Sequence, residues 1–359
     1  MKGRTFIGWV IVVAIVGMVI PAGADTHAPW PADWNNWSDP NLMVTVGNPG
    51  NAPDIEVMED GTSGYGSVSY EYKIGKFEVT AGQYCEFLNK VATTDTYGLY
   101  DASMWSDPYA CQIQQLVSSG SYTYRVEPDW ANRPVNYVSW GDAARFCNWL
   151  TNGQPTGPQD ANTTEDGSYY LNGATTDAQL VAVTRKTVAE GGRYYIPTED
   201  EWYKAAYYKG AGANAGYWDY PTSSDTAPGQ DMNDASGNNA NYHTAPYAWP
   251  IDSGIYTTGA GEFQNSESPY GTFDQGGNVW EWNEAILYYD DYYGSFRGLR
   301  GGSHAGGGDI HASCRSGSIG PPMFVYEGLI GFRVSEVPEP ASMAILALGG
   351  LALIRRRRR

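Results

Sequence analysis

Helical spacing of apolar residues is convincing in only three segments of this 359-residue chain, and that scarcity limits its fold more than any other feature. Each segment begins with a hydroxyl residue, followed three positions later by a side chain that can bond back to the first backbone N–H. The three pairs are Thr80 with Gln83, Ser139 with Asp142, and Thr198 with Glu201. We predict a capped helix at each, every cap contributing roughly 1 kcal/mol.

After each cap, apolar side chains recur at i, i+3, i+4 and i+7, which gives each helix one face for the core. The stripes are Tyr84, Phe87, Leu88 and Val91; Ala143, Phe146, Cys147 and Leu150; and Trp202, Ala205 and Ala206. We assign Cys147 to core packing or to a disulfide before any reactive role.

Short alternating segments between the helices predict strands at 69–79, 193–196 and 329–334. Residues 151–192 and 210–265 are rich in Gly, Asn, Asp, Thr and Ser and show no sustained period. Loops of that length in a compact domain are usually functional or held by ions. The predicted fold class is therefore α+β, with few helices, small antiparallel sheets and long ordered loops.

The first 24 residues have the parts of a secretory signal peptide. Two basic residues precede an apolar stretch over residues 6–20, and an A-x-A cleavage site ends at Ala24. An uncleaved membrane anchor is the alternative, but the stretch is shorter than the roughly 20 residues that a membrane span needs. We expect cleavage before Asp25 and export, which leaves a short N-terminal segment over residues 25–41.

Residues 337–359 form a second targeting segment. A Val-Pro-Glu-Pro sequence at 337–340 precedes an apolar run over 341–354 and five arginines. The run is short for a span, although arginines can extend their charges to the cytoplasmic headgroups. This order resembles the PEP-CTERM sorting signal of Gram-negative bacteria, which an exosortase-type transpeptidase processes. A plain tail anchor has the same topology but would keep its helix. We expect membrane contact during sorting and a final place in the periplasm, on the cell surface or in the extracellular matrix.

The remaining chain is strongly acidic. Residues 1–24 hold two of the 22 basic residues and 341–359 hold five, and neither segment holds an acid, so 15 basic residues face 40 acidic ones. A surface with a formal charge near −25 repels phosphate backbones, so we expect no nucleic-acid partner. Acidic oxygens instead favour solubility and hard cations such as calcium.

Four cysteines occur in a chain expected to enter an oxidising compartment. They are Cys85, Cys111, Cys147 and Cys314. Three disulfide pairings are possible, and the sequence does not choose among them. No C-x-x-C occurs, so neither a thioredoxin-like nor a zinc-ribbon function has support.

Six motifs follow one another in order over residues 42–336, which we take as one domain. They are YKIGKFEVT at 72–80, PVNYVSW at 134–140, IPTEDEW at 196–202, GGNVWEW at 276–282, RGGS at 300–303 and GFRV at 331–334. Together they resemble the formylglycine-generating enzyme, or sulfatase-modifying factor, family, although Tyr195 and Ile196 replace its usual Arg and Leu. The resemblance implies a C-type-lectin-like core elaborated with long loops.

Most of this signature has a structural explanation. We expect the four tryptophans to fill the core, with their indole N–H groups bonded to loop carbonyls. We expect the four glycines to adopt backbone conformations closed to other residues. The residues are Trp140, Trp202, Trp280 and Trp282, and Gly276, Gly277, Gly301 and Gly302.

The resemblance implies an oxidation that needs two cysteines, three and eight residues after the serine of RGGS, because a thiolate pair binds copper. Gly306 and His311 occupy those positions. Cys314 stands alone nearby, so we expect neither copper binding nor formylglycine-generating activity. His304, Asp309 and His311 form a loose two-histidine, one-carboxylate pattern for another metal, with ordinary loop residues as the alternative.

The resemblance also implies structural calcium. The first site would use the side chains of Asp274 and Glu281 with the backbone carbonyls of Gly277 and Val279. The alternative is a Glu281 that only caps a turn. A second site would use Asn241, Tyr242, Asp252 and Gly254. Ligation by oxygen alone from loops suits calcium.

These observations favour an exported, non-catalytic domain that acts as a binding module of the cell surface or matrix, with an extracellular glycan or protein as ligand. Aromatic residues at 288–293 could stack on a ligand or pack under a neighbouring loop. An oxidase with an atypical site, built on a rearranged cysteine pair or a metal at His304 and His311, is the first alternative. A purely structural matrix component is the second.

Overall fold

The computed structural model describes residues 42–210, 212, 215–243, 256–290, 294–305, 309–317 and 328–338. The predicted signal peptide, the segment 25–41 and all but the first two residues of the tail lie outside this part of the chain. Within it, no helix is long and apolar enough to cross a membrane.

All three predicted helices form where their caps are. Helices α1 (Ala81–Val91), α3 (Trp140–Thr151) and α5 (Glu199–Tyr207) start after Thr80, Ser139 and Thr198, each with a complete capping box. Every residue of the three predicted apolar stripes is buried, Cys147 among them. The periodicity therefore identified both the helices and their core faces correctly.

Two short helices were not predicted. These are α2 (Ser103–Ser106) and α4 (Asp177–Ala182), and 3-10 turns form at Pro128–Trp130 and Val188–Glu190. Helix α4 lies within the segment 151–192 that we expected to be a loop. It has its own capping box, but Leu180 is its only buried residue. Its sequence therefore has no apolar stripe from which a helix could be predicted.

One antiparallel sheet joins the two ends of the domain. Its strands are β1 (Met43–Val46), β2 (Tyr72–Gly75), β10 (Ser335–Glu336) and β5 (Tyr194–Tyr195), in that spatial order. In this sheet Ser335 pairs with Ile74 on one side and with Tyr195 on the other. The end of the domain is therefore fixed between strands that lie far apart in the sequence.

A second sheet has the order β8-β7-β6-β9. Its strands are β6 (Trp280–Asp290), β7 (Gly294–Arg300), β8 (Ser316–Gly317) and β9 (Ile330–Gly331). Strand β9 runs parallel to β6, and the others are antiparallel. A separate hairpin joins β3 (Ile113–Ser118) to β4 (Ser121–Val126). The predicted strand segments contain β2, β5 and β9, whereas both long hairpins were missed.

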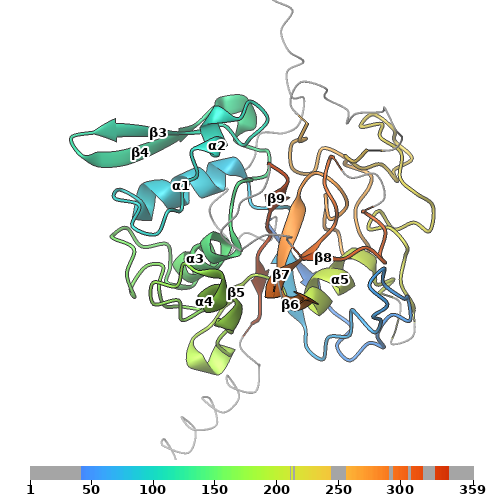
Figure 1. The fold of residues 1–359 in the computed structure, drawn as a ribbon. Helices are drawn as coiled ribbons and strands as arrows, with labels where there is room; N and C mark the ends of the chain where they lie inside the picture. The colour runs from blue at the N-terminus through green and yellow to red at the C-terminus, as the bar shows by residue number, and fades with distance from the viewer. Residues whose placement is uncertain are drawn as a thin grey trace, which may run out of the picture.

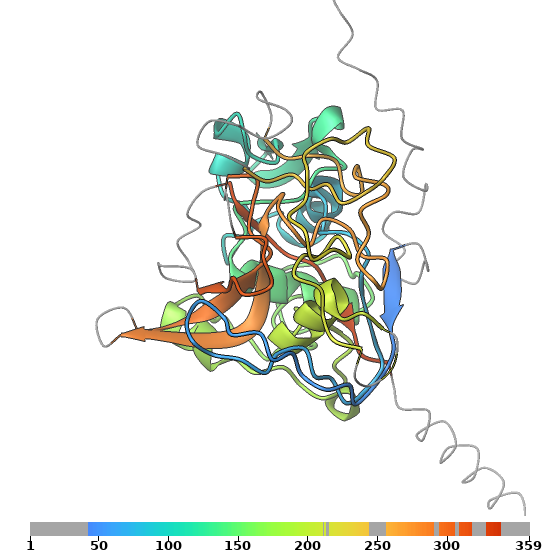
Figure 2. The same ribbon diagram turned by 90° about the vertical axis from the view of Figure 1, so that its right-hand side faces the viewer.

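The elements separate into two regions (Figures 1 and 2). The helical half, residues 81–192, carries α1, α3, α4 and the β3–β4 hairpin, and the loop-rich half comprises the described residues of 47–70 and 199–279 with α5. Strands β6, β7 and β9 lie between them (Figure 1). In the helical half the Phe146 ring lies 5.3 Å from that of Phe87 and 5.4 Å from that of Phe332. An aromatic core thus ties α1 and α3 to the strand after β9.

The tryptophans fill the core largely as predicted, but their N–H groups differ from expectation. Trp282 donates to the Val138 carbonyl at 2.9 Å, as expected, whereas Trp202 donates to the carboxylate of Glu281 at 2.7 Å. Trp280 is only half-buried. The buried N–H of Trp140 has no hydrogen-bond partner among the described residues, and its ring lies 3.7 Å from the Arg297 guanidinium instead.

Three of the four motif glycines have positive φ, as predicted. These are Gly277, Gly301 and Gly302. Gly276 does not, and it is needed for a close approach, because a Cβ there would lie 2.6 Å from a side-chain carbon of Pro221.

Candidate functional site

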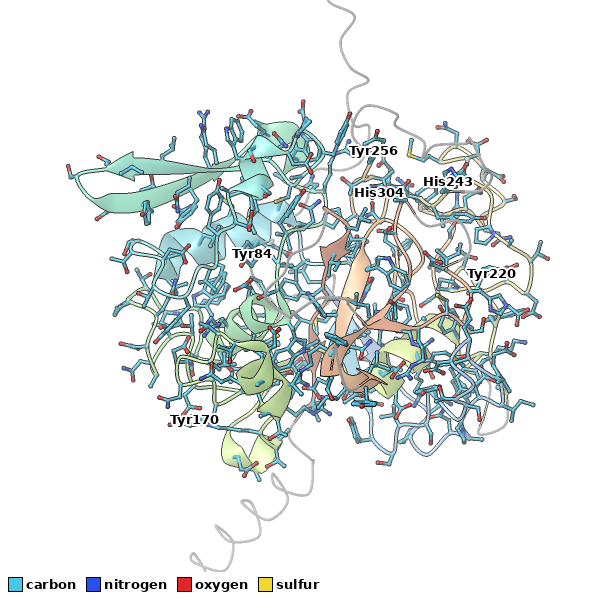
Figure 3. The ribbon with its side chains drawn as sticks, viewed as in Figure 1. Tyr84, Tyr170, Tyr220, His243, Tyr256 and His304 are labelled. Atoms are coloured by element: carbon cyan, nitrogen blue, oxygen red, sulfur yellow. The ribbon has the colours of Figure 1, made fainter. Side chains whose placement is uncertain are left out.

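A pocket of about 350 Å³ opens where the two halves meet. The helical half contributes Asp107, Tyr109 and Tyr137. The other lining residues are Tyr256, His304, Ala305, Gly328 and Leu329. We call this hollow the seam pocket. Figure 3 shows Tyr256 and His304 side by side there, far from Tyr170 at the opposite end of the molecule.

His304 is held by a loop contact. Its backbone N–H donates to the Asn278 carbonyl at 3.0 Å, and its ring Nδ1 lies 2.9 Å from the same oxygen. Because a carbonyl only accepts, Nδ1 must carry the proton. Burial lowers the pKa of His304, so the ring is neutral at pH 7 and its Nε2 is a hydrogen-bond acceptor.

Three tyrosines line the pocket beside this imidazole. The Tyr256 ring is parallel to that of His304, with centroids 5.5 Å apart, and lies 4.2 Å from the Tyr109 ring. The carboxylate of Asp107 accepts from the Tyr109 backbone N–H at 2.9 Å and from the Tyr137 hydroxyl at 2.5 Å. Burial and this carboxylate together raise the pKa of Tyr137, which keeps its proton.

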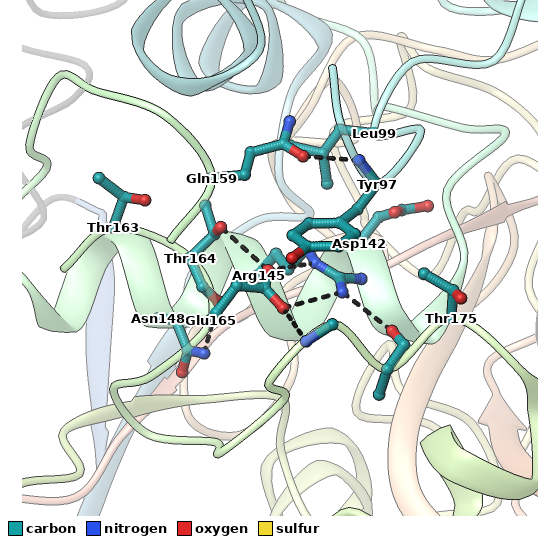
Figure 4. Close-up of polar contacts among 12 residues, drawn as sticks. Tyr97, Leu99, Asp142, Arg145, Asn148, Gln159, Thr163, Thr164, Glu165 and Thr175 are labelled. Carbon is teal, nitrogen blue, oxygen red and sulfur yellow. Dashed lines mark hydrogen bonds and ion pairs between the residues drawn. The ribbon is translucent and has the colours of Figure 1, made fainter. Parts of the chain in front are cut away.

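A smaller hollow of about 100 Å³ shares Tyr137 with the seam pocket. Its lining also includes Tyr97, Asp101, Asp142 and Arg145. Figure 4 shows Arg145 between the Tyr97 ring, 4.6 Å away, and Glu165, which accepts from it at 2.7 and 3.2 Å. The guanidinium charge is therefore already balanced inside the protein.

The four cysteines are all buried free thiols, so none of the disulfides that the sequence allowed is formed. Cys147 packs in the core, and none lines the described part of the seam pocket. Burial, with smaller contributions from Asp309 and Glu59, raises the pKa of Cys314 to about 12. A protonated thiol is a poor copper ligand, because the metal binds the thiolate.

The two histidines after the RGGS motif have different surroundings. The Nδ1 atom of His311 lies 2.8 Å from the Ser313 hydroxyl, and its ring packs against Tyr220 with centroids 5.2 Å apart. Among the described residues, no group of three or more His, Cys, Asp or Glu side chains is arranged to hold a metal. The pattern of His304, Asp309 and His311 thus gains no support, and Gly306 lies outside the described residues.

The residues of the first predicted calcium site lie close together. Glu281 accepts from Arg333 at 2.5 and 2.6 Å and from Trp202, so both its oxygens are engaged. Asp274, with φ of 60°, accepts from the Gly261 backbone N–H at 2.6 Å, and burial raises its pKa to about 7.

Sequence reasoning missed Glu78 at this place. It is buried and accepts from the Asn278 amide at 2.9 Å and from the Val279 backbone N–H at 3.3 Å. Burial, and then Asp274 and Glu281, raise its pKa. Three carboxyls therefore lie around one guanidinium, that of Arg333, and burial raises the pKa of Glu78 and Asp274, so protonation offsets part of their charge. Among the described residues these carboxyls are not arranged as a metal site.

The second predicted calcium site is only partly within the described residues. Asp252 and Gly254 lie outside them, and the Tyr242 carbonyl accepts from the Gln230 amide. Among the described residues, the buried side-chain oxygen of Asn241 has no hydrogen-bond partner. A buried amide oxygen is destabilising unless some partner satisfies it, and a cation is one such partner.

The pocket residues come from segments that no single sequence signal connects. Tyr137 belongs to the PVNYVSW motif, but Tyr256 lies within the aperiodic region 210–265, and Asp107 directly follows the unpredicted helix α2. Of the predicted aromatic segment 288–293, Tyr288 is exposed on β6 and is not among the described residues that line the pocket, whereas residues 291–293 lie outside the described residues.

An α+β domain with few helices, small sheets and long ordered loops, whose pocket lies between a helical and a loop-rich region, is an elaborated loop scaffold. The chain belongs to the sulfatase-modifying factor enzyme 1-like (FGE-sulfatase) family, whose model matches residues 61–336. The PEP-CTERM protein-sorting motif matches residues 336–359. That motif marks a protein exported across the inner membrane and processed by exosortase-type sorting machinery.

Solved structures with similar folds have low sequence identity. Treponema denticola variable protein 1 is 18% identical, with a TM-score of 0.45, over 82% of this chain and 95% of that one. CarF is 18% identical, with a TM-score of 0.44, over 83% and 98%. PvdO from Pseudomonas aeruginosa is 19% identical, with a TM-score of 0.43, over 82% and 94%. Comparison with curated proteins found no match.

Proposed function

We propose that this exported protein is a non-catalytic binding module of the cell surface or extracellular matrix, and that the seam pocket holds its ligand. One observation carries the proposal. The described lining offers phenols, an imidazole and a carboxylate, whereas the four cysteines are buried elsewhere. Aromatic side chains with polar tips supply contact area and hydrogen bonds at little conformational cost, as binding surfaces require.

The first experiment separates binding from oxidation. The purified full chain, in a mild detergent, is incubated with copper and a peptide containing Cys-x-Pro-x-Arg. We expect the peptide mass to stay unchanged, because Gly306 and His311 occupy the positions of the two required cysteines and Cys314 is the only cysteine near them in the sequence. Loss of the thiol mass would show that the protein is an oxidase and would overturn the proposal.

The second experiment tests the pocket directly. Glycan and peptide arrays are probed with the full chain and with Tyr256→Ala, and Tyr170→Ala serves as the control. Tyr170 is 60% exposed and distant from the pocket (Figure 3). We expect a signal that Tyr256→Ala loses and Tyr170→Ala keeps. An intact signal in Tyr256→Ala would place the ligand elsewhere, and an empty array would favour a structural matrix role.

We also propose structural calcium in the loop-rich half, at one or both predicted sites. Two observations support it: the buried carboxyls of Glu78, Asp274 and Glu281 lie near one another, and the side-chain oxygen of Asn241 has no hydrogen-bond partner among the described residues. Calcium should raise the midpoint of thermal unfolding relative to chelator, and magnesium should raise it less because it demands stricter geometry. Identical unfolding curves with calcium and with chelator would count against the proposal.

A further inference from the structure

We propose that the seam pocket takes a protonated amine carried directly on a sugar ring, so that the ligand is a glycan containing hexosamine. This inference rests on the proposed binding function and narrows it to one class of ligand. The argument uses the hydrogen-bonding character of the lining, its aromatic faces and its charge.

Three polar side chains of the pocket, those of His304, Tyr137 and Asp107, are acceptors. The Nδ1 atom of His304 donates to the Asn278 carbonyl, which leaves Nε2 to accept, and no described residue bonds it. The Tyr137 hydroxyl donates its one proton to Asp107, so its oxygen can only accept from a ligand. Asp107 itself is a carboxylate. A primary ammonium group brings three donors and no acceptor, which matches such a lining.

The charge of the pocket also favours a cationic ligand. No lysine or arginine is among the described residues that line the seam pocket, and Asp107 gives it a negative charge. The chain carries a formal charge of −18, which attracts cations over longer distances. The rings of Tyr109, Tyr137 and Tyr256 also line the pocket, and aromatic rings attract cations.

A sugar ring suits the pocket better than a lysine side chain. The acceptors and the ring faces share one hollow of about 350 Å³, so charge and apolar surface must come from the same compact unit. A hexosamine brings apolar C–H groups to the aromatic residues that line the hollow and carries its amine on the same ring, close to the acceptors. A lysine carries its amine on a flexible four-carbon stem and would leave much of the ring surface uncovered.

The smaller hollow indicates a chain of several sugars. Its lining also includes Tyr137 and adds Asp101 and Asp142, while Arg145 is already paired with Glu165. Both hollows are therefore rich in acceptors and aromatic surface. A linear oligomer that crosses Tyr137 would meet the same chemistry at each end.

Calorimetric titration of the purified full chain in a mild detergent tests the inference with three probes. They are a β-linked glucosamine tetramer, its fully N-acetylated counterpart and a trilysine peptide. We expect the glucosamine tetramer to bind at least about tenfold more tightly than the acetylated one, and added salt to weaken it, because acetylation removes the charge and two donors. We expect no measurable binding of trilysine.

Variants separate the amine from the ring. Asp107→Asn should reduce the preference for glucosamine at least about fivefold while the acetylated tetramer is little affected, and Tyr256→Ala should weaken both sugars. Tyr170→Ala should change neither, and near-UV circular dichroism verifies that each variant is folded.

The outcomes distinguish the two proposals. Equal binding of both tetramers, lost in Tyr256→Ala, would overturn the amine while keeping the binding function. Tight binding of trilysine alone would replace the glycan by a cationic peptide and would overturn the inference. Binding unaffected by Tyr256→Ala would remove the seam pocket from both proposals.

Discussion

The helical half and the loop-rich half satisfy their backbone groups in different ways. In the helical half, α1 and α3 bond their own N–H and C=O groups, and rings such as Phe87 and Phe146 can pack between them without polar partners. Beside the loop-rich half, buried charged side chains from the adjoining strands bond the irregular backbone instead. Arg300, the last residue of β7, donates to the carbonyls of Ala312 and Cys314 at 2.9 and 2.7 Å and pairs with Glu199 of α5.

Arg333, just after β9, also bonds irregular backbone through a buried charged side chain. It donates to the carbonyls of Gly75 and Phe273 at 2.9 and 3.0 Å, and it pairs with Glu281, which also holds the indole of Trp202. Irregular backbone cannot bond to itself, so an ordered loop region needs such buried donors and acceptors. The comparison teaches that the packed helices α1 and α3 are stabilised by apolar contacts, whereas irregular backbone in either half, including that around Arg145, is stabilised by buried charged groups.

Removal of Arg333 should give the largest effect. Arg333→Met would leave Glu281 buried and unpaired beside Glu78 and Asp274, and breaking a buried pair from one side costs about 3–5 kcal/mol. We expect the free energy of unfolding, from urea denaturation followed by tryptophan fluorescence, to fall by that amount.

A matched control tests whether burial is the reason. Arg125 also pairs with a glutamate, Glu127, but its side chain is 58% exposed and the atoms are 3.8 Å apart. Arg125→Met should change the free energy of unfolding by less than about 1 kcal/mol. If both substitutions had the same small effect, buried charges would not be what stabilises the loop-rich half.

Glu284 should make the free energy of unfolding depend on pH. It lies on β6 between the halves, accepts from Tyr169 at 2.5 Å and pairs with Arg185 at 3.5 Å. Burial raises its pKa from 4.5 to about 7 despite the opposing effect of Arg185. A raised pKa means that the folded state holds the proton more tightly, so this stabilisation is complete below pH 4.5 and is lost as the pH rises through 7.

Glu284→Gln should remove that dependence. Between pH 4.5 and 8 the variant should gain up to about 3 kcal/mol of unfolding free energy relative to the unchanged protein, since each pKa unit corresponds to about 1.4 kcal/mol. Glu267→Gln, at an exposed loop position, is the control and should show no such trend. Urea titrations at several pH values measure the difference, and parallel curves for both variants would refute the prediction.

The same contrast explains how much could be predicted from the sequence. Apolar spacing and caps identified α1, α3 and α5 because both signals are local. Helix α4 was missed because only Leu180 is buried, and β6–β7 because its long strands carry a mixed pattern with two register shifts. The six motifs predicted the family, and the match of the family model to residues 61–336 confirms it.

The candidate site was much less accessible to sequence reasoning. Its lining joins Asp107, Tyr256 and His304, whose neighbourhood depends on how loops fold back on one another. Of these, only His304 was singled out, and for a metal rather than a binding role. Glu78 was missed for the same reason. It lies in a strand-like motif, and its carboxyl comes near Asp274 and Glu281 only in the folded protein.

The smallest predicted effect concerns the helix caps, for which the two halves should respond alike to substitution. Helix α5 belongs to the loop-rich half, yet its start depends on the Thr198 hydroxyl, which accepts from the Glu201 backbone N–H at 3.1 Å. Thr198→Ala should lower the free energy of unfolding by about 1 kcal/mol, as for caps in general, and Thr198→Ser should restore most of it. Ser139→Ala, at the cap of α3, should give a loss of the same order. The carboxylate of Glu201 accepts hydrogen bonds from Arg185 and from the Tyr70 hydroxyl. A loss several times larger at Thr198 alone would therefore mean that the cap also positions Glu201. In that case, even local capping in this half would depend on the buried charges.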